Sequence, residues 1–370
     1  MISSEHSCAI EQLPSGVKAC LAGVPERVGA EGLPTVASIN EFRAAWSEFA
    51  KPHIAGPLAD DVVIEDYPEH NSYHHNPLPI RIYRPLHTKA ELKPVILCTS
   101  GGGFIANRLE TNQTPWSNLA KTTGLPVITY QYTTAPEVPF IGERSRSLAE
   151  AEAITEWLFI HAAKMGFDVH NIFLAGDSSG GNFAIYQAYT AIKKGFLPKR
   201  LILISPVVDL SRTFYGFGGG SEEFARYEAD EEVDKLLSAP LVNACYSLYA
   251  PDISTRNSPL VSPLYINDLA ASLPPTEIIV ASCDRLKRDA FALKQKLGAL
   301  ATLYVLPGTH AFLTARALFG SEPGPNPASL AASVIKLTLG QSFEGMLDGL
   351  AFFKPCSDPK LTPHSTFAPV

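Results

Sequence analysis

Residues 175–182 read AGDSSGGN and directly follow the apolar residues 172–174, IFL. Within this stretch, residues 176–180 fit the pattern G-x-S-x-G, in which a serine lies at a sharp turn from a buried strand into a helix. The bend forces that residue into a strained backbone, and glycines two positions before and after it leave the necessary room. The pattern therefore predicts that Ser178 presents its hydroxyl outward and that Ser179 contributes its backbone N–H.

Short β-rich runs alternate with longer helical patterns from residue 61 onward. The predicted strands are 61–66, 78–85, 94–100, 126–132, 171–176, 200–205, 276–282 and 302–307. The predicted helices are 116–123, 145–165, 182–194 and 286–297. The later strands are almost continuously apolar, as expected of a parallel sheet that is buried on both faces. This alternation predicts the α/β fold class.

Two regions interrupt the alternation, residues 1–60 and residues 212–261. The first contains a helical pattern, and the second combines a glycine-rich loop with an acidic segment that is typical of a solvated helix face. We expect both regions to form a cap over one end of the sheet. The predicted core is residues 61–211 and 262–350, followed by a tail at 351–370.

The bulk composition is typical of a globular protein without a nucleic-acid partner. With 370 residues, of which 46% are hydrophobic, the chain can fill a sizeable core. The formal net charge of −7 provides no basic field to hold a phosphate backbone or an anionic membrane. No segment approaches about eighteen uninterrupted apolar residues, so no membrane span is expected.

The cysteines and the N-terminal sequence favour a cytoplasmic location. Six cysteines lie far apart, without a C-x-x-C pair or the close spacing of a disulfide scaffold. The first residues, MISSEHSCAIEQL, lack the basic and apolar regions of a secretory signal. We therefore expect reduced thiols.

A serine hydroxyl becomes a strong nucleophile only when a base accepts its proton and an acid orients that base. Among ten histidines, only His310 comes directly after the last predicted strand, where the edge of the sheet would bring it to Ser178. Asp284 ends the preceding strand, which gives the order serine, aspartate, histidine that this kind of turn predicts. Asp209 and Asp289 are the alternatives for the acid.

The other histidines do not form a clear site. His161 and His170 flank the helix before the turn and are expected at the surface. The segment HNSYHH, residues 70–75, follows Glu69 but offers no clear fourth ligand. We therefore expect no metal site.

Residues 100–104 read SGGGF and follow a predicted strand. Consecutive glycines let the backbone approach a ligand closely and expose N–H groups, and the Ser179 N–H would face them. The loop is therefore a candidate oxyanion hole, with Phe104 beside it as a predicted wall of the substrate pocket. The alternative is a flexible turn without chemistry.

Five segments in order along the chain resemble the hormone-sensitive-lipase-like branch of the α/β-hydrolases. GDSSGGN stands where that family carries GDSAGGN. The other segments are YTTAPEVPF (132–140), NSPLVSPL (257–264), DRL (284–286) and GTHAF (308–312). The resemblance covers about residues 60–320.

This resemblance implies an eight-stranded, mostly parallel sheet flanked by helices, with one antiparallel strand and a helical cap. It implies hydrolysis of carboxylic esters without metal or cofactor, and oxyanion donors at the N–H groups of Gly102, Gly103 and Ser179. Two departures stand out. Ser100 replaces the first residue of the family's HGGG loop, whose histidine braces the loop, and Arg288 replaces a second aspartate.

The residues thus predict a serine hydrolase for a neutral, apolar ester of small to medium size. One alternative is a non-hydrolytic relative, a dehydratase, cyclase or acyltransferase that tailors a natural product in secondary metabolism. Another is a non-catalytic receptor that binds a small molecule in the same pocket. An exposed final strand also makes a homodimer a possible assembly.

Overall fold

The computed structural model describes ten ranges or single residues of the chain. They are 39–40, 43–44, 58–70, 78–86, 92–142, 145–211, 237, 239–306, 310 and 327–340. Most of the predicted cap at 1–60, residues 212–236 of the cap insertion, and the tail lie outside the described residues. The proposed domain boundaries therefore stay predictions.

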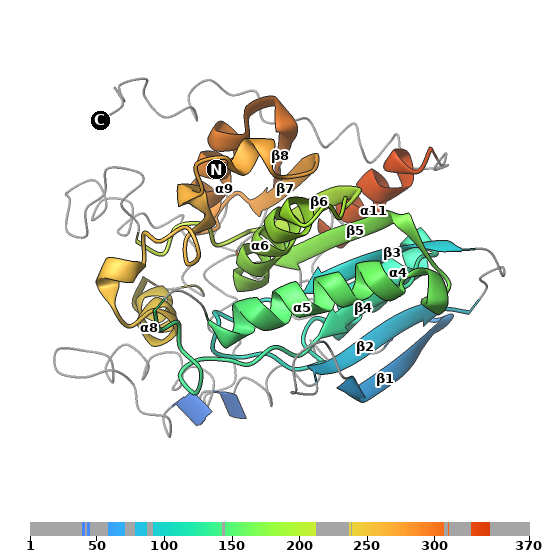
Figure 1. The fold of residues 1–370 in the computed structure, drawn as a ribbon, viewed down its shortest axis with the longest axis horizontal. Coiled ribbons are helices and arrows are strands. Elements are labelled where there is room, and N and C mark those ends of the chain that lie inside the picture. The colour runs from blue at the N-terminus through green and yellow to red at the C-terminus, as the bar shows by residue number, and fades with distance from the viewer. Residues whose placement is uncertain are drawn as a thin grey trace, which may run out of the picture.

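Eight strands form one sheet in the order β1-β2-β4-β3-β5-β6-β7-β8 (Figure 1). Their bounds are β1 Val62–His70, β2 Leu78–Pro85, β3 Lys93–Thr99, β4 Val127–Tyr130, β5 Phe167–Asp177, β6 Arg200–Ile204, β7 Thr276–Ala281 and β8 Ala301–Leu306. Strand β2 pairs antiparallel with both β1 and β4, and every pairing from β4 to β8 is parallel. The predicted mostly parallel sheet with one antiparallel strand is confirmed.

The helices cover both faces of this sheet. They are α4 Gln113–Thr123, α5 Arg146–His161, α6 Ser179–Lys193, α8 Ala239–Tyr249, α9 Lys287–Leu297 and α11 Pro327–Thr338. Short 3₁₀ turns are η1 Ala163–Met165, η2 Ile253–Thr255, η3 Pro263–Tyr265, η4 Leu269–Ala271 and η5 Gly298–Leu300. Figure 1 shows α5 and α6 in front of the sheet and α11 behind it.

Alternate side chains of β3 pack into two separate hydrophobic cores, one on each face of the sheet. Val95 and Leu97 belong to the core under α5 and α6, whereas Ile96 and Cys98 belong to the core shared with α4 and α11. All four are fully buried. This is the two-residue period of a strand that is covered on both faces, and it explains why the sequence there is continuously apolar.

The predicted elements are confirmed with small shifts at their ends. Strand β5 begins at Phe167, earlier than predicted, and the predicted helix 145–165 divides into α5 and η1. Residues 39–40 and 43–44 are helical, as the pattern there predicted. Helix α8 lies beyond one end of the sheet, within the predicted cap insertion (Figure 1). In the described ranges, no helix is both long and apolar enough to cross a bilayer.

Candidate active site

Ser178 lies between the end of β5 and the start of α6, in a strained backbone conformation. Its φ is 53° and its ψ is −123°, values that a residue with a side chain rarely adopts. The Ser178 N–H donates to Ile204 O at 2.9 Å, and the Ser178 carbonyl accepts from the N–H groups of Gly181 and Val207, both at 3.0 Å. These bonds to β6 and the loop after it hold the strained turn in place.

The glycines around the turn are required by close backbone contacts. A Cβ added to Gly176 would overlap the backbone oxygen of Gly180, and one added to Gly180 would overlap the backbone oxygen of Thr99. Helix α6 therefore starts in direct contact with the ends of β5 and β3. This contact is the reason for the glycine spacing in the motif.

The three residues predicted to act together are adjacent in space. His310 Nε2 lies 3.0 Å from Ser178 Oγ, and His310 Nδ1 lies 3.0 Å from each carboxylate oxygen of Asp284. The Asp284 carboxylate is buried and also accepts from the Leu286 N–H at 2.7 Å. With the Nδ1 proton held by Asp284, Nε2 faces the hydroxyl as a proton acceptor.

The alternative acids have other partners. Asp289 Oδ2 accepts from the N–H groups of Val208 and Asp209, at 2.7 and 3.2 Å. Asp209 Oδ1 accepts from the N–H and the hydroxyl of Ser211, at 2.9 and 2.6 Å. Both carboxylates thus organise the chain after β6, whereas the Asp284 carboxylate is hydrogen-bonded to His310.

The remaining histidine predictions have mixed outcomes. His170 is exposed, whereas His161 is half-buried and its Nδ1 lies 2.9 Å from Trp157 O. Residues 71–75 of the HNSYHH segment lie outside the described part of the chain. Within that part, no group of three or more histidine, cysteine, aspartate or glutamate side chains is arranged to hold a metal ion.

The glycine loop lies directly against the turn that holds Ser178. An ideal Cβ on Gly101 would be 2.9 Å from Ser178 Cβ. Gly102 and Gly103 have φ values of 140° and 62°, and the Gly102 carbonyl accepts from the N–H groups of Ile105 and Ala106. The N–H groups of Gly102, Gly103 and Ser179 have no hydrogen-bond acceptor among the described residues. Three backbone donors beside a serine hydroxyl suit a negatively charged oxygen.

Ser100 braces this loop, although its side chain is shorter than histidine. Its hydroxyl accepts from Trp116 Nε1 at 2.9 Å and donates to Thr111 O at 3.2 Å. Its carbonyl accepts from the Tyr132 hydroxyl at 2.9 Å. The partners come from α4, the segment before it and the segment after β4, so the brace joins three parts of the chain. Sequence reasoning missed the contacts with Trp116 and Thr111, because neither residue lies in a motif.

Asp177 supports the loop from the other side. Its Oδ1 accepts from the Gly101 N–H at 3.0 Å and from Asn112 Nδ2 at 2.8 Å. Burial raises the pKa of Asp177 to about 6, against the opposing effect of these hydrogen bonds and of His310. A titratable group thus lies between the serine turn and the glycine loop.

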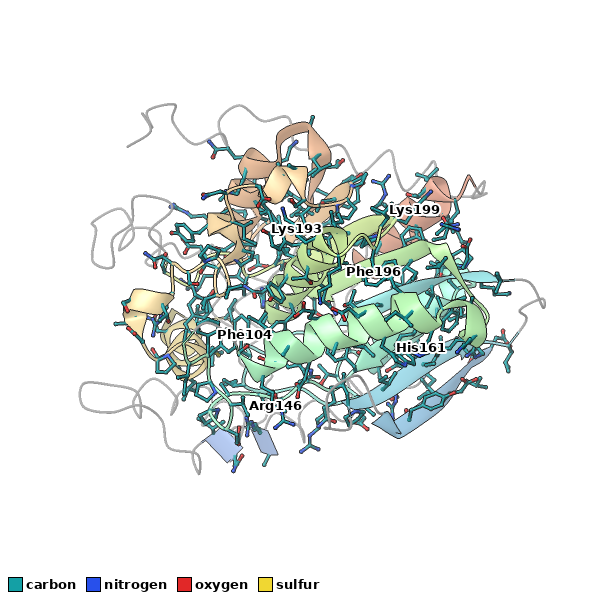
Figure 2. The ribbon with its side chains drawn as sticks, viewed as in Figure 1. Phe104, Arg146, His161, Lys193, Phe196 and Lys199 are labelled. Carbon is teal, nitrogen blue, oxygen red and sulfur yellow. The ribbon has the colours of Figure 1, made fainter. Side chains whose placement is uncertain are left out.

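Phe104, the predicted wall of the substrate pocket, lies in the hydrophobic core beside the glycine loop. The ring is only 1% exposed. It stacks on Tyr249 of α8, with centroids 4.2 Å apart, and meets the edge of Phe183 at 5.5 Å. Figure 2 shows Phe104 beside α8, near the start of α5. The ring therefore anchors the glycine loop in the core, and a contact with substrate stays a prediction.

Comparison with known proteins identifies the class that this fold and site define. A family profile described as alpha/beta hydrolase fold matches residues 96–313, more than half of the chain. The chain belongs to the alpha/beta hydrolase fold family. The resemblance to hormone-sensitive-lipase-like carboxylesterases is confirmed.

Three relatives illustrate the similarity. An ethyl acetate hydrolase of Pseudomonas putida is 30% identical over 246 residues, which is 64% of this chain and 71% of that protein. The hormone-sensitive lipase of Mus musculus is 26% identical over 270 residues, which is 65% of this chain but 34% of the mouse protein. The structure of EstE1, a thermostable carboxylesterase cloned from a metagenomic library, has a TM-score of 0.69 and 25% identity, over 82% of this chain and 99% of that one.

The contact between Gly180 and β3 makes a prediction about stability. We expect Gly180→Ala to lower the free energy of unfolding by about 3 kcal/mol, because the added methyl group meets the rigid backbone of Thr99. Gly195→Ala is the control. Gly195 has open space around it but a φ of 83°, and this left-handed backbone costs an alanine about 1–2 kcal/mol. Urea unfolding of both variants measures the difference. Equal losses would contradict the close contact.

The raised pKa of Asp177 makes a prediction about pH. Because its folded pKa of about 6 lies above the reference value of 3.8, the stability that its protonated form contributes is lost as the pH rises through 6. Asp177→Asn does not titrate, so we expect its stability relative to wild type to rise with pH. The total gain is about 3 kcal/mol, roughly half of it between about pH 5 and pH 8.

Urea unfolding of wild type and Asp177→Asn at several pH values measures this gain. The comparison cancels the other carboxylates, which titrate in both proteins. A stability difference that does not change with pH would show that Asp177 titrates normally.

Proposed function

We propose that this protein hydrolyses carboxylic esters of small to medium apolar substrates through an acyl-enzyme on Ser178. The observation that carries the proposal is the chain of contacts from Asp284 through His310 to Ser178 Oγ, each at 3.0 Å. The chain is a carboxylesterase-type serine hydrolase. It acts on a small-molecule ester and, in this proposal, needs neither a metal ion nor a cofactor.

In the first half of the reaction, Ser178 Oγ attacks the ester carbonyl carbon and His310 Nε2 accepts the hydroxyl proton. Asp284 holds the imidazole and stabilises its cationic form. The negative carbonyl oxygen lies among the N–H groups of Gly102, Gly103 and Ser179. Collapse of this intermediate breaks the ester bond, and His310 returns its proton to the departing alcohol.

In the second half, water attacks the acyl carbon while His310 accepts a proton from the water. The same amides hold the negative oxygen. The acid then leaves, and His310 returns the proton to Ser178 Oγ. Over the two halves, one ester and one water molecule are converted into one carboxylic acid and one alcohol.

The names of the relatives support a short acyl group. They include an ethyl acetate hydrolase and an acetyl esterase. These names are all of hydrolases and give no support to the dehydratase, cyclase or acyltransferase alternative. A receptor function would require none of the contacts between the serine, the histidine and the aspartate.

Three further parts of the proposal concern location, assembly and metabolic context. The described cysteines Cys98, Cys245 and Cys283 are free thiols, which supports a cytoplasmic location. Strand β8 is the last described strand at its edge of the sheet, which supports pairing of two copies there. The departure at Ser100 from the family loop is the sequence feature behind a role in secondary metabolism, and that role stays a prediction.

Replacement of the nucleophile tests the reaction. We expect Ser178→Ala to lower the rate of p-nitrophenyl acetate and butyrate hydrolysis by on the order of 10⁴-fold or more, because no other group can form the acyl-enzyme. Ser254→Ala, at an exposed turn, is the control. A fluorophosphonate should label wild type and Ser254→Ala but not Ser178→Ala. Full activity in Ser178→Ala would refute the proposed nucleophile.

Replacement of the acid tests the role of Asp284. We expect Asp284→Asn to lower kcat by about 10⁴-fold, since the histidine then loses the partner that fixes its tautomer. Asp209→Asn, which alters the alternative acid, should change kcat by less than about tenfold. Steady-state kinetics of the two folded variants decide between them. A larger loss in Asp209→Asn would reverse the assignment.

A further inference from the structure

The guanidinium of Arg43, a residue of the N-terminal region, forms hydrogen bonds with the segment that follows the glycine loop. Arg43 Nε–H donates to Ile105 O at 2.6 Å, and Arg43 Nη2–H donates to Ala135 O at 2.7 Å and to Thr134 Oγ1 at 2.8 Å. The Arg43 side chain is 18% exposed, so these bonds are partly shielded from water. A residue from the predicted cap therefore reaches two core loops at once.

A carboxylate fixes the orientation of this guanidinium. Glu137 accepts from Arg43 Nη1 at 2.6 Å and from Nη2 at 2.8 Å, as a two-point pair, so the two Nη2 hydrogens are shared among three acceptors. The hydrogen bond from Arg43 lowers the pKa of Glu137. Asn40 Oδ1 accepts a further bond from Nη1 at 3.1 Å. With every guanidinium nitrogen engaged, the Nε–H has a defined direction toward Ile105.

Two peptide groups connect that bond to a predicted oxyanion donor. The peptide that carries Ile105 O also carries the Ala106 N–H, which donates to Gly102 O at 3.0 Å. The peptide that carries Gly102 O also carries the Gly103 N–H. A continuous chain of hydrogen bonds thus runs from Arg43 to the amide plane of Gly103.

A second chain reaches the same carbonyl. The Ala135 N–H donates to Phe104 O at 2.9 Å, and the next N–H, of Ile105, donates to Gly102 O at 3.1 Å. Arg43 supports this route through the neighbouring peptide group, because its Nη2 donates to the Ala135 carbonyl, which lies in the peptide after the one that carries the Ala135 N–H. Both hydrogen bonds that Gly102 O accepts from this segment therefore depend on backbone that one side chain anchors.

We propose that Arg43 is a positioning residue that orients the Gly103 N–H toward the negative oxygen of the transition state. This inference rests on the proposed ester hydrolysis. Rotation of the 102–103 peptide plane moves its carbonyl and its N–H together, so a carbonyl held by two bonds keeps the N–H aimed. Along the first chain, through Ile105 O and the Ala106 N–H, the positive charge of Arg43 polarises each peptide in the direction that strengthens the Gly103 donor.

Such a residue affects the transition state more than substrate binding. Loss of a whole oxyanion donor costs about 10²–10³-fold in kcat, and a misaimed donor should cost less. We expect Arg43→Ala to lower kcat for p-nitrophenyl butyrate by about tenfold to a hundredfold, with KM changed by less than about threefold. Arg43→Lys keeps the positive charge but loses the planar set of guanidinium donors, so its kcat should lie between those of Arg43→Ala and wild type.

Arg84→Ala is the matched control. Arg84 also forms a two-point pair with a glutamate, Glu65, at 2.8 and 3.1 Å, but from β2. We expect its kcat to equal that of wild type within about twofold. If Arg43→Ala fails to fold, the comparison of Arg43→Lys with Arg84→Lys carries the test.

Hydrogen exchange of residues 101–107, read by mass spectrometry, adds a measurement that does not depend on activity. We expect the amides of Ile105 and Ala106 to exchange at least about tenfold faster in Arg43→Ala than in Arg84→Ala, because their bonds to Gly102 O open more often. An unchanged kcat, or a loss that appears in KM alone, would overturn the positioning role even if exchange accelerates.

Failure of the proposed function gives a different result. In that case wild type releases no p-nitrophenol and no fluorophosphonate labels Ser178. The exchange measurement still decides whether Arg43 holds the loop, and unchanged exchange in Arg43→Ala would overturn that hold by itself.

Discussion

The strained backbone at Ser178 is the constraint on which the rest of the structure depends. A φ of 53° at a residue with a side chain is unfavourable by itself, and it persists because β6 and the loop after it bond both ends of the turn. The same turn requires backbone contact between α6 and the strand ends, which only glycine permits at residues 176 and 180. The parallel sheet therefore does more than fill the core, since it fixes where one hydroxyl is presented.

Around this turn, the site consists of backbone groups that are held from several directions. Ser100 is bound by α4, and Asp177 bonds the first amide of the glycine loop. Phe104 fixes the end of the loop by stacking on Tyr249 of α8. Donors that are aimed before substrate arrives do not have to reorient during the reaction, which is the physical basis of electrostatic catalysis.

The sequence predicted those features that leave a local pattern. Apolar periodicity located the strands, and the G-x-S-x-G spacing together with chain order located Ser178, Asp284 and His310. It did not predict Trp116, Thr111 or Arg43 as partners of the glycine loop. The Arg43 contacts with Ile105 and with residues 134–137 join positions 62 to 94 apart, and neither periodicity nor spacing records such contacts. The sequence placed Phe104 beside the glycine loop but did not predict that its ring is buried against Tyr249, because a large aromatic residue beside a ligand loop and one in the core look alike in sequence.

The central claim is that an acyl group passes through Ser178. Rapid acid quenching of the enzyme with p-nitrophenyl butyrate, followed by intact mass and peptide mapping, tests it most directly. The account predicts a transient butyryl group on Ser178 that forms and decays at the rate of turnover. Turnover without any acylated protein, or with the acyl group on another side chain, would contradict it.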